Sequence, residues 1–210
     1  MFEKRKARDA ANALEDATSQ WSARIAALES LIGVVDGSKV LPTNGLLLKP
    51  GEVLLGQVQQ VGLIQERSDG GHWQGASQGF SIPIGSIKGH SVRYRVGATR
   101  GHYVQGQPHP TAVDHGTLSI TDQRIVYQGA TKTAECLFTK LLGVQQSDGA
   151  IVISVSNRQK PTIVHVGSSL EDWVADRISI ATSLYQGDRD EVLARLHEQR
   201  DEVAAAKPSA

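Results

Sequence analysis

The chain has 210 residues, and its 22 lysines and arginines are balanced by 22 aspartates and glutamates, so the formal net charge is zero. Such a balance produces no overall attraction to nucleic acid or to an acidic membrane, which argues against a general nucleic-acid binder. The length allows one domain with a proper hydrophobic core plus helical extensions. The 21 glycines, spread along the chain, indicate many turns and hence many short strands.

The N-terminal segment and the cysteine content predict a cytoplasmic location. Residues 1–11 carry charges with no apolar core behind them, so they do not resemble a signal peptide. No stretch approaches the roughly 18 consecutive apolar residues that a transmembrane segment needs. Cys136 is the one cysteine and cannot form a disulfide within the chain, which suits a reducing compartment. Peripheral attachment to a membrane is the alternative location.

Residues 1–36 are predicted to form an amphipathic helix, because apolar residues recur at steps of three and four along one face. This face is a candidate interaction surface. Its main residues are Leu14, Trp21, Ile25 and Leu28. A helix hairpin, the seam of a dimer or the wall of a sheet would each cover such a face.

Short apolar runs between residues 45 and 167 alternate with turn residues and predict antiparallel strands. Residues 117–121 alternate with period two, Asp122-Gln123 makes a tight break, and residues 124–127 resume the pattern. Asp148-Gly149 is a strong hairpin signal between two further runs. Strands of about five residues with such regular turns favour an antiparallel barrel or sandwich.

Two helices are predicted after the strands. Ser168 and Glu171 have the spacing of a capping box, and apolar residues at helical steps follow, with Trp173 near the start. A helix with a large aromatic residue at this place is suited to cover the open end of a barrel. Residues 188–205 form a second, charged helix, and residues 206–210 form a frayed tail.

The segment HGTLSITDQRIVYQGATKTAECLF, residues 115–138, resembles the bacterial relatives of GRAM and pleckstrin-homology (PH) domains. Those relatives carry a pattern close to G-T-L-x-I-T-x-x-R-[IVL]-[IVF]-[FY]-x-G. The matching residues are Gly116, Thr117, Leu118, Ile120, Thr121, Arg124, Ile125, Val126, Tyr127 and Gly129. The resemblance covers residues 112–186 and extends more loosely back to Leu46, through residues 49–52 and 95–97.

The resemblance implies an α+β fold with mostly antiparallel strands: a seven-stranded PH/GRAM-like barrel over residues 45–186, capped by one C-terminal helix. It also implies binding rather than catalysis. Asp122, before Arg124, is expected to serve the local turn. The helices at the two ends of the chain lie outside the resemblance. Whether residues 45–101 complete the barrel or form a separate β-subdomain is open at this point.

A basic segment lies between Asp69 and Asp114, an interval without acidic residues. Its lysine and arginines are Lys88, Arg93, Arg95 and Arg100. Arg93 and Arg95 are two apart and would share one face of a strand. Guanidinium groups bind phosphate in bidentate fashion, so these are candidate ligands of phosphate or anionic lipid. A solvated basic strand, or one that faces an acidic protein or the acidic helix after Asp188, is the alternative interpretation.

Catalytic and metal sites find little support in the sequence. No GxSxG or GxxxxGK[ST] motif occurs, and Asp114-His115 is explained by the polarity of a turn at the start of a strand. Cys136 lies in an alternating stretch, where a buried core residue is expected rather than a nucleophile. The histidines are scattered. We expect no catalytic residue, no metal and no cofactor; an enzyme of unknown class is a further alternative.

Trp73 follows a glycine pair in a loop-like setting, where a large aromatic residue either anchors a partner or covers a neighbouring strand. The sequence as a whole predicts a non-enzymatic binding or adaptor module that binds a protein partner or associates with its own copy. A peripheral reader of anionic lipid or phosphate, through residues 88–100, is the alternative. We expect no nucleic-acid partner.

Overall fold

The computed structural model describes residues 2–68, 72–87, 90–104 and 108–208, with side chains for residues 5–6, 8–9, 11–67 and 109–208. Its contacts divide the chain into two units: residues 1–64 with 112–210, and residues 65–111. The elements are α1 (Phe2–Asp36), β1 (Leu54–Ser68), β2 (His72–Ile87), β3 (His90–Val104), β4 (Pro108–Thr121), β5 (Arg124–Gly129), β6 (Thr133–Leu137), the 3-10 helix η1 (Phe138–Lys140), β7 (Leu141–Ser147), β8 (Ala150–Val155), β9 (Thr162–His165), α2 (Ser168–Gln186) and α3 (Arg189–Ala205).

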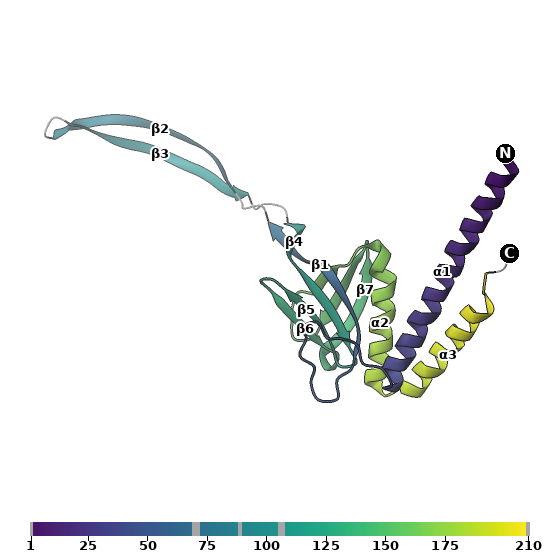
Figure 1. Cartoon of the computed structure of the whole chain (residues 1–210). Helices are drawn as coiled ribbons and strands as arrows, with labels where there is room; N and C mark the ends of the chain where they lie inside the picture. Colours follow the sequence, from purple (N-terminus) through teal and green to yellow (C-terminus); the bar gives the residue numbers. More distant parts are fainter. Residues whose placement is uncertain (1, 69–71, 88–89, 105–107, 209–210) are drawn as a thin grey trace. The chain divides into compact units, whose positions relative to one another are not determined.

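The larger unit has the expected α+β fold, with seven strands in the order β6-β5-β4-β1-β9-β8-β7 (Figure 1). Every strand pair with a described register is antiparallel. The sheet differs from the expected barrel because it is not closed: β6 and β7 stand at its two ends and are not hydrogen-bonded to each other. The chain passes between these ends through η1.

Two hairpins follow the turn signals of the sequence. Ile120 of β4 pairs with Ile125 of β5 across the Asp122-Gln123 break. Asp148 and Gly149 join β7 to β8 with φ of 48° and 79°, the left-handed conformation that tight hairpin turns require. These local patterns therefore predicted both turns correctly.

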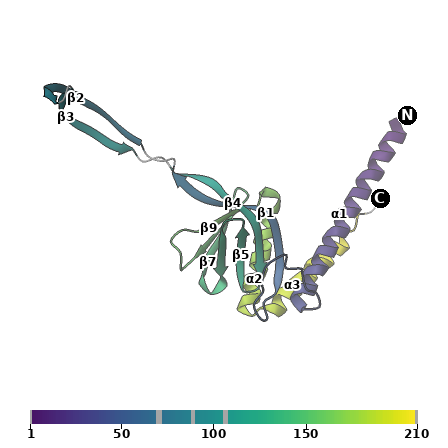
Figure 2. The same ribbon diagram turned by 60° about the vertical axis from the view of Figure 1, so that its left-hand side comes forward.

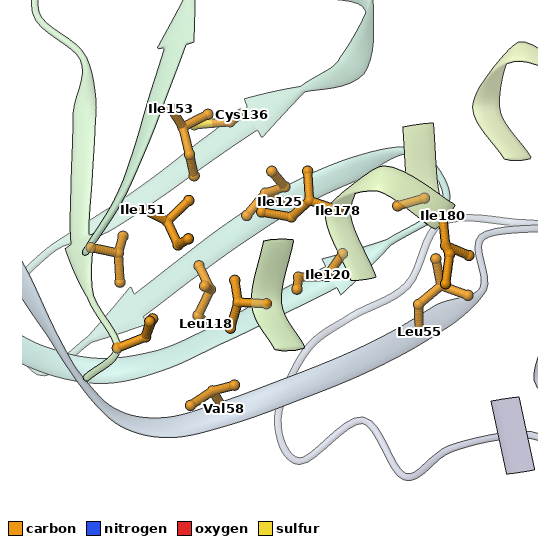
Figure 3. Close-up of a cluster of buried hydrophobic side chains, with 14 of the residues drawn as sticks. Leu55, Val58, Leu118, Ile120, Ile125, Cys136, Ile151, Ile153, Ile178 and Ile180 are labelled. Carbon is orange, nitrogen blue, oxygen red and sulfur yellow. The ribbon is translucent and has the colours of Figure 1, made fainter. Parts of the chain in front are cut away.

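The hydrophobic core lies between the sheet and α2 (Figure 3). Leu118 and Ile120 alternate along β4 and are both fully buried, as period-two patterning requires for a strand that faces a core. The labelled side chains of the core are Leu55, Val58, Leu118, Ile120, Ile125, Cys136, Ile151, Ile153, Ile178 and Ile180. A second cluster of Leu46, Leu54 and Val126 lies apart from it.

Helix α2 follows β9 directly and packs on the core through Val174, Ile178 and Ala181, which are all buried. A Cβ on Gly56 of β1 would lie 2.6 Å from the ring of Trp173, so the glycine allows the indole to rest on the strand. The expected capping box is not formed. Gly167 occupies the N-cap position, and the Glu171 carboxylate accepts a hydrogen bond from the Gly149 N–H at 2.7 Å.

Helices α1 and α3 lie side by side in both views (Figures 1 and 2). Arg189, at the start of α3, donates to the carbonyl of Val35, at the end of α1, at 2.8 Å. Trp21 Nε1, nearer the start of α1, donates to the carbonyl of Val203 at 2.6 Å. The two helices are therefore antiparallel. The last turns of α1 enter the hydrophobic core, where its buried residues are Leu31, Ile32, Val34 and Val35.

The smaller unit is a two-stranded ribbon of β2 and β3. Its register runs from His72 opposite Val104 to Ile87 opposite His90, with one irregularity after Pro83. Residues 54–64 thus belong to the seven-stranded sheet, whereas residues 65–111 form a unit of their own. No helix within the described residues is long and apolar enough to cross a lipid bilayer.

Candidate functional site

Arg124 of the signature forms one charged network with Glu52 and Glu135. The Glu52 carboxylate, whose side chain is 0% exposed, accepts hydrogen bonds from Arg124 Nε at 2.7 Å and from Nη2 at 2.9 Å. Thr121 Oγ1 and the Lys49 N–H donate to the same carboxylate at 2.7 and 2.6 Å. Arg124 Nη1 also reaches Glu135 Oε1 at 2.6 Å. The network joins the loop before β1, the β4–β5 turn and β6.

Glu52 and Arg124 stabilise each other's charged forms within the fold. Burial by itself raises the pKa of Glu52, but hydrogen bonds from Arg124, Lys49 and Thr121 outweigh it, so this pKa lies below its ordinary value. The hydrogen bond to Glu52 is the main reason why the pKa of Arg124 is raised. Each charge meets its counter-charge within the chain, and we therefore assign the pair to structure rather than to ligand binding.

Asp122 makes a long-range contact rather than serving its own turn. Its Oδ1 accepts a hydrogen bond from the Val53 N–H at 2.8 Å, and its own N–H donates to the Val53 carbonyl at 3.0 Å. Burial raises the pKa of this carboxyl. The expected local role of Asp122 is thus replaced by attachment of the β4–β5 turn to the chain just before β1.

The Asp114 carboxylate is occupied by backbone donors. It accepts hydrogen bonds from the N–H groups of His115 at 3.0 Å, Thr131 at 3.1 Å and Lys132 at 2.8 Å. Burial alone raises the pKa of Asp114, but these hydrogen bonds together lower it. The side chain thus holds the turn between β5 and β6, whereas the sequence placed Asp114 in a turn at the start of a strand; it lies within β4.

Cys136 is a core residue of β6. Its Sγ lies 3.7 Å from Thr162 Oγ1, and burial raises the pKa of the thiol, which disfavours the nucleophilic thiolate. Among the described residues, no group of three or more histidine, cysteine, aspartate or glutamate side chains is placed to hold a metal ion. Asp114 and Cys136, which the sequence analysis considered for catalysis, thus both make contacts within the fold.

A groove between β7 and α2 is a candidate site. Its volume is about 530 Å³, and its lining includes Leu142, Gly143, Gln146, Ala175, Ile178 and Ser179. Leu142 is 71% exposed although its neighbours in sequence are apolar. It stands at a β-bulge, between Leu141 and Gly143, which pair with Val155 and Ser154 of β8. Sequence reasoning missed this groove; an unbroken apolar run at residues 141–144 was the available signal.

The apolar face predicted for α1 is largely used within the chain. Trp21 is half-buried against α3, where its ring also lies 5.5 Å from Lys207 Nζ. Leu28 packs against the hydrophobic core. Leu14 and Ile25 are half-buried on the same helix. These contacts account for much of the face that the sequence left without a cover.

The predicted anion-binding residues fall on the ribbon. Arg93, Arg95 and Arg100 are positions of β3, opposite Pro83, Ser81 and Ala76 of β2. Lys88 lies outside the described residues, as do the side chains of the three arginines. Trp73 is a β2 position opposite Tyr103, so its backbone belongs to a strand, and its side chain is likewise outside the description.

Comparisons with known proteins gave no match: no protein-family model, no curated protein and no solved structure was found to be similar to this chain. The functional argument therefore depends on the chain's own geometry. Within the side chains that the structure describes, that geometry directs attention to the groove between β7 and α2.

Proposed function

We propose that this chain is a non-enzymatic binding module of PH/GRAM-like architecture that recognises a protein partner. The observation that carries the proposal is the β7–α2 groove with Leu142 exposed at its rim. An exposed apolar side chain beside a groove favours recognition of a protein surface, because covering it removes apolar area from water. A second copy of this chain is one form that the partner can take.

Two further observations support a binding module. A seven-stranded sheet whose last strand is followed at once by a helix supports the proposal, while the open ends at β6 and β7 depart from the barrel that the resemblance implies. Arg124 of the signature and Glu52 neutralise each other inside the fold, and Asp114 holds a turn. These three charged residues thus maintain a scaffold, which leaves recognition to surfaces such as the groove.

The test compares proteins crosslinked to the tagged full chain in its native host. Leu142→Asp and Ser179→Arg alter exposed side chains in the groove, and Leu47→Asp alters a leucine of 87% exposure elsewhere. We expect one partner to be held by the wild type and by Leu47→Asp, and about tenfold less by the groove variants, with purified proteins reproducing the order.

Two results would count against the proposal. If no protein is held above the level of an untagged control, and light scattering shows a monomer at all concentrations, protein recognition is contradicted. If a partner is held equally by all four proteins, recognition occurs on another surface, and the groove loses its assigned role.

A second candidate function is recognition of an anionic lipid or phosphate through β3. It is favoured by the register of the ribbon, in which Arg93 and Arg95 are alternate positions of one strand. Alternate strand positions share a face, and two guanidinium groups there would suit a phosphate. The interval from residue 72 to residue 104 contains no acidic residue that would compete.

Sedimentation with vesicles of anionic and of neutral lipid tests this second function. We expect binding to anionic vesicles that weakens with added salt and is lost when Lys88, Arg93 and Arg95 are all replaced by glutamine. Replacement of Arg5, Lys6 and Arg8 in α1 is the matched control, since it removes the same charge from another element. Equal binding by both triple variants would refute the assignment to β3.

A further inference from the structure

The groove lies along an edge of the sheet. Strand β7 pairs with β8 on one side and, among the described residues, has no strand on the other. An edge strand of this kind directs alternate N–H and C=O groups outward, where only another extended backbone satisfies them in register. The open edge therefore favours a peptide over a ligand without a backbone.

Helix α2 runs beside this edge in the opposite direction. Gln146, near the end of β7, donates to Asp172 in the first turns of α2 at 3.1 Å. Phe138, just before β7, has its ring 5.8 Å from that of Tyr185, near the end of α2. The groove is thus a channel with a strand edge as one wall and a helix as the other.

The walls leave room for a backbone. Gly143, Ala175 and Ser179 are small residues of the lining, and a Cβ added to Gly143 would meet no atom within 4 Å. Leu142 supplies the exposed apolar surface, and Ile178 also lines the groove but is only 3% exposed. Small side chains beside an open strand edge allow close approach of a peptide main chain, and the exposed leucine favours an apolar side chain in the middle of that peptide.

The two ends of the channel differ in charge. Glu171 and Asp172 are both held at the β7–β8 turn, through hydrogen bonds from the Gly149 N–H and the Gln146 amide. Asp148 belongs to the same turn and is exposed. Lys140 precedes β7 at the opposite end. A strand antiparallel to β7 would begin at the acidic end, so charge complementarity favours a basic residue in its N-terminal part.

We propose that the groove binds an extended peptide segment of a protein partner, which adds to β7 as an antiparallel strand. An apolar side chain of the peptide contacts Leu142, and a lysine or arginine in its N-terminal part faces Asp172. This inference rests on the proposed function and specifies the chemistry of the partner.

The probe is a library of random peptides of about twelve residues, enough to span a strand of the usual length, selected on the immobilised full chain. We expect enriched peptides with alternating apolar residues and a basic N-terminal half. Their affinity should fall about tenfold for Leu142→Asp and for Ser179→Arg and stay unchanged for the matched control Leu47→Asp. Asp172→Asn should weaken binding about threefold, an effect that added salt reduces.

Hydrogen exchange of the full chain gives a readout of strand addition that does not depend on any variant. The bound peptide should slow exchange of amides within Gly143–Ser147, because outward N–H groups of the edge then become donors to it. Protection confined to other elements, or no enrichment above a library selected on the bare support, would overturn the inference. Equal affinity for wild type, Leu142→Asp and Ser179→Arg would do the same.

The two proposals fail in different ways. A host protein that binds the chain through the groove as a folded domain, with no protection of β7 and no enriched peptide, would refute strand addition and leave protein recognition standing. If neither a host protein nor a peptide binds, both proposals are refuted.

Discussion

The carboxylate of Glu52 meets the guanidinium of Arg124 through two hydrogen bonds, of 2.7 and 2.9 Å, across 72 residues of sequence. Their side chains are 0% and 12% exposed. Removing two charges from water is costly, and a pair of this kind is tolerated only when its hydrogen bonds are satisfied. Loss of either side chain should therefore lower the stability of the fold strongly, although neither residue lines the β7–α2 groove.

We expect Glu52→Gln to lower the free energy of unfolding by about 3 kcal/mol, because it leaves much of the Arg124 charge buried without its partner. Urea unfolding followed by circular dichroism measures the loss. Asp201→Asn is the control, since the Arg200–Asp201 pair is exposed and should be worth less than about 1 kcal/mol. Equal losses in the two variants would contradict the structural role of Glu52.

The stability should depend on pH through the same carboxylate. The folded-state pKa of Glu52 is lowered from 4.5, so its contribution is complete above that value and is lost as the pH falls through the folded pKa. Urea midpoints measured between about pH 3 and pH 6 should therefore fall steeply for the wild type and less steeply for Glu52→Gln. Asp122→Asn should not flatten the curve, because burial raises the pKa of Asp122 and its contribution has the opposite sign. A wild-type slope unchanged by Glu52→Gln would contradict the assignment.

Gly56→Ala should loosen the contact between β1 and α2. Its new methyl would stand 2.6 Å from the Trp173 ring, so the ring must move, at a cost of about 1–3 kcal/mol. Gly143→Ala is the matched control, because its methyl would meet nothing within 4 Å. Thermal unfolding separates the two, and adding Trp173→Phe should recover part of the loss in Gly56→Ala. A Gly56→Ala protein as stable as Gly143→Ala would contradict this packing.

Removal of the first turns of α1 should affect stability much less than removal of the whole helix. Deletion of residues 1–12, whose described side chains are all exposed, should leave the thermal midpoint within a few degrees of the wild type. Deletion of residues 1–36 also removes Leu31, Ile32, Val34 and Val35 from the core and should leave a chain without cooperative unfolding. Circular dichroism on both proteins checks this, and a folded longer deletion would show that α1 is dispensable.

The ribbon should be removable. Strands β1 and β4 are neighbours in the sheet, and a Cβ on Gly62 would lie 3.9 Å from that of Ala112. Replacing residues 66–110 with Asn-Gly should therefore let β1 and β4 form an ordinary hairpin. We expect cooperative unfolding to be retained and any binding to anionic vesicles to be lost. Failure of this protein to fold, in three independent turn sequences, would show that the ribbon supports the sheet.

Local patterns in the sequence predicted the elements that depend on neighbouring residues. The alternation at residues 117–121 and 124–127, the turn at Asp148-Gly149 and the helical steps after Ser168 each report on contacts within a few positions. The capping box failed because Glu171 has another donor near it, the Gly149 N–H, which is distant in sequence. The spacing alone could not reveal that competitor.

Contacts between segments that are distant in sequence could not be predicted from local sequence patterns. The attachment of Asp122 to Val53 spans 69 residues, and turn chemistry explained the same aspartate locally. The open edge of β7 follows from strand order, which apolar alternation does not specify. For that reason the sequence pattern indicated an ordinary strand residue at Leu142, and the groove beside it was not predicted.

The ribbon is entered from β1 and left into β4, two strands that already lie next to each other. If residues were added to the ribbon or removed from it in facing pairs, the strand pairing of the larger unit would not change. Insertions, deletions and changes of charge should consequently accumulate in residues 65–111 far faster than in the strands with Leu118 or Ile151. Proteins that descend from this chain could thereby gain a new binding partner through the ribbon while keeping the same hydrophobic core.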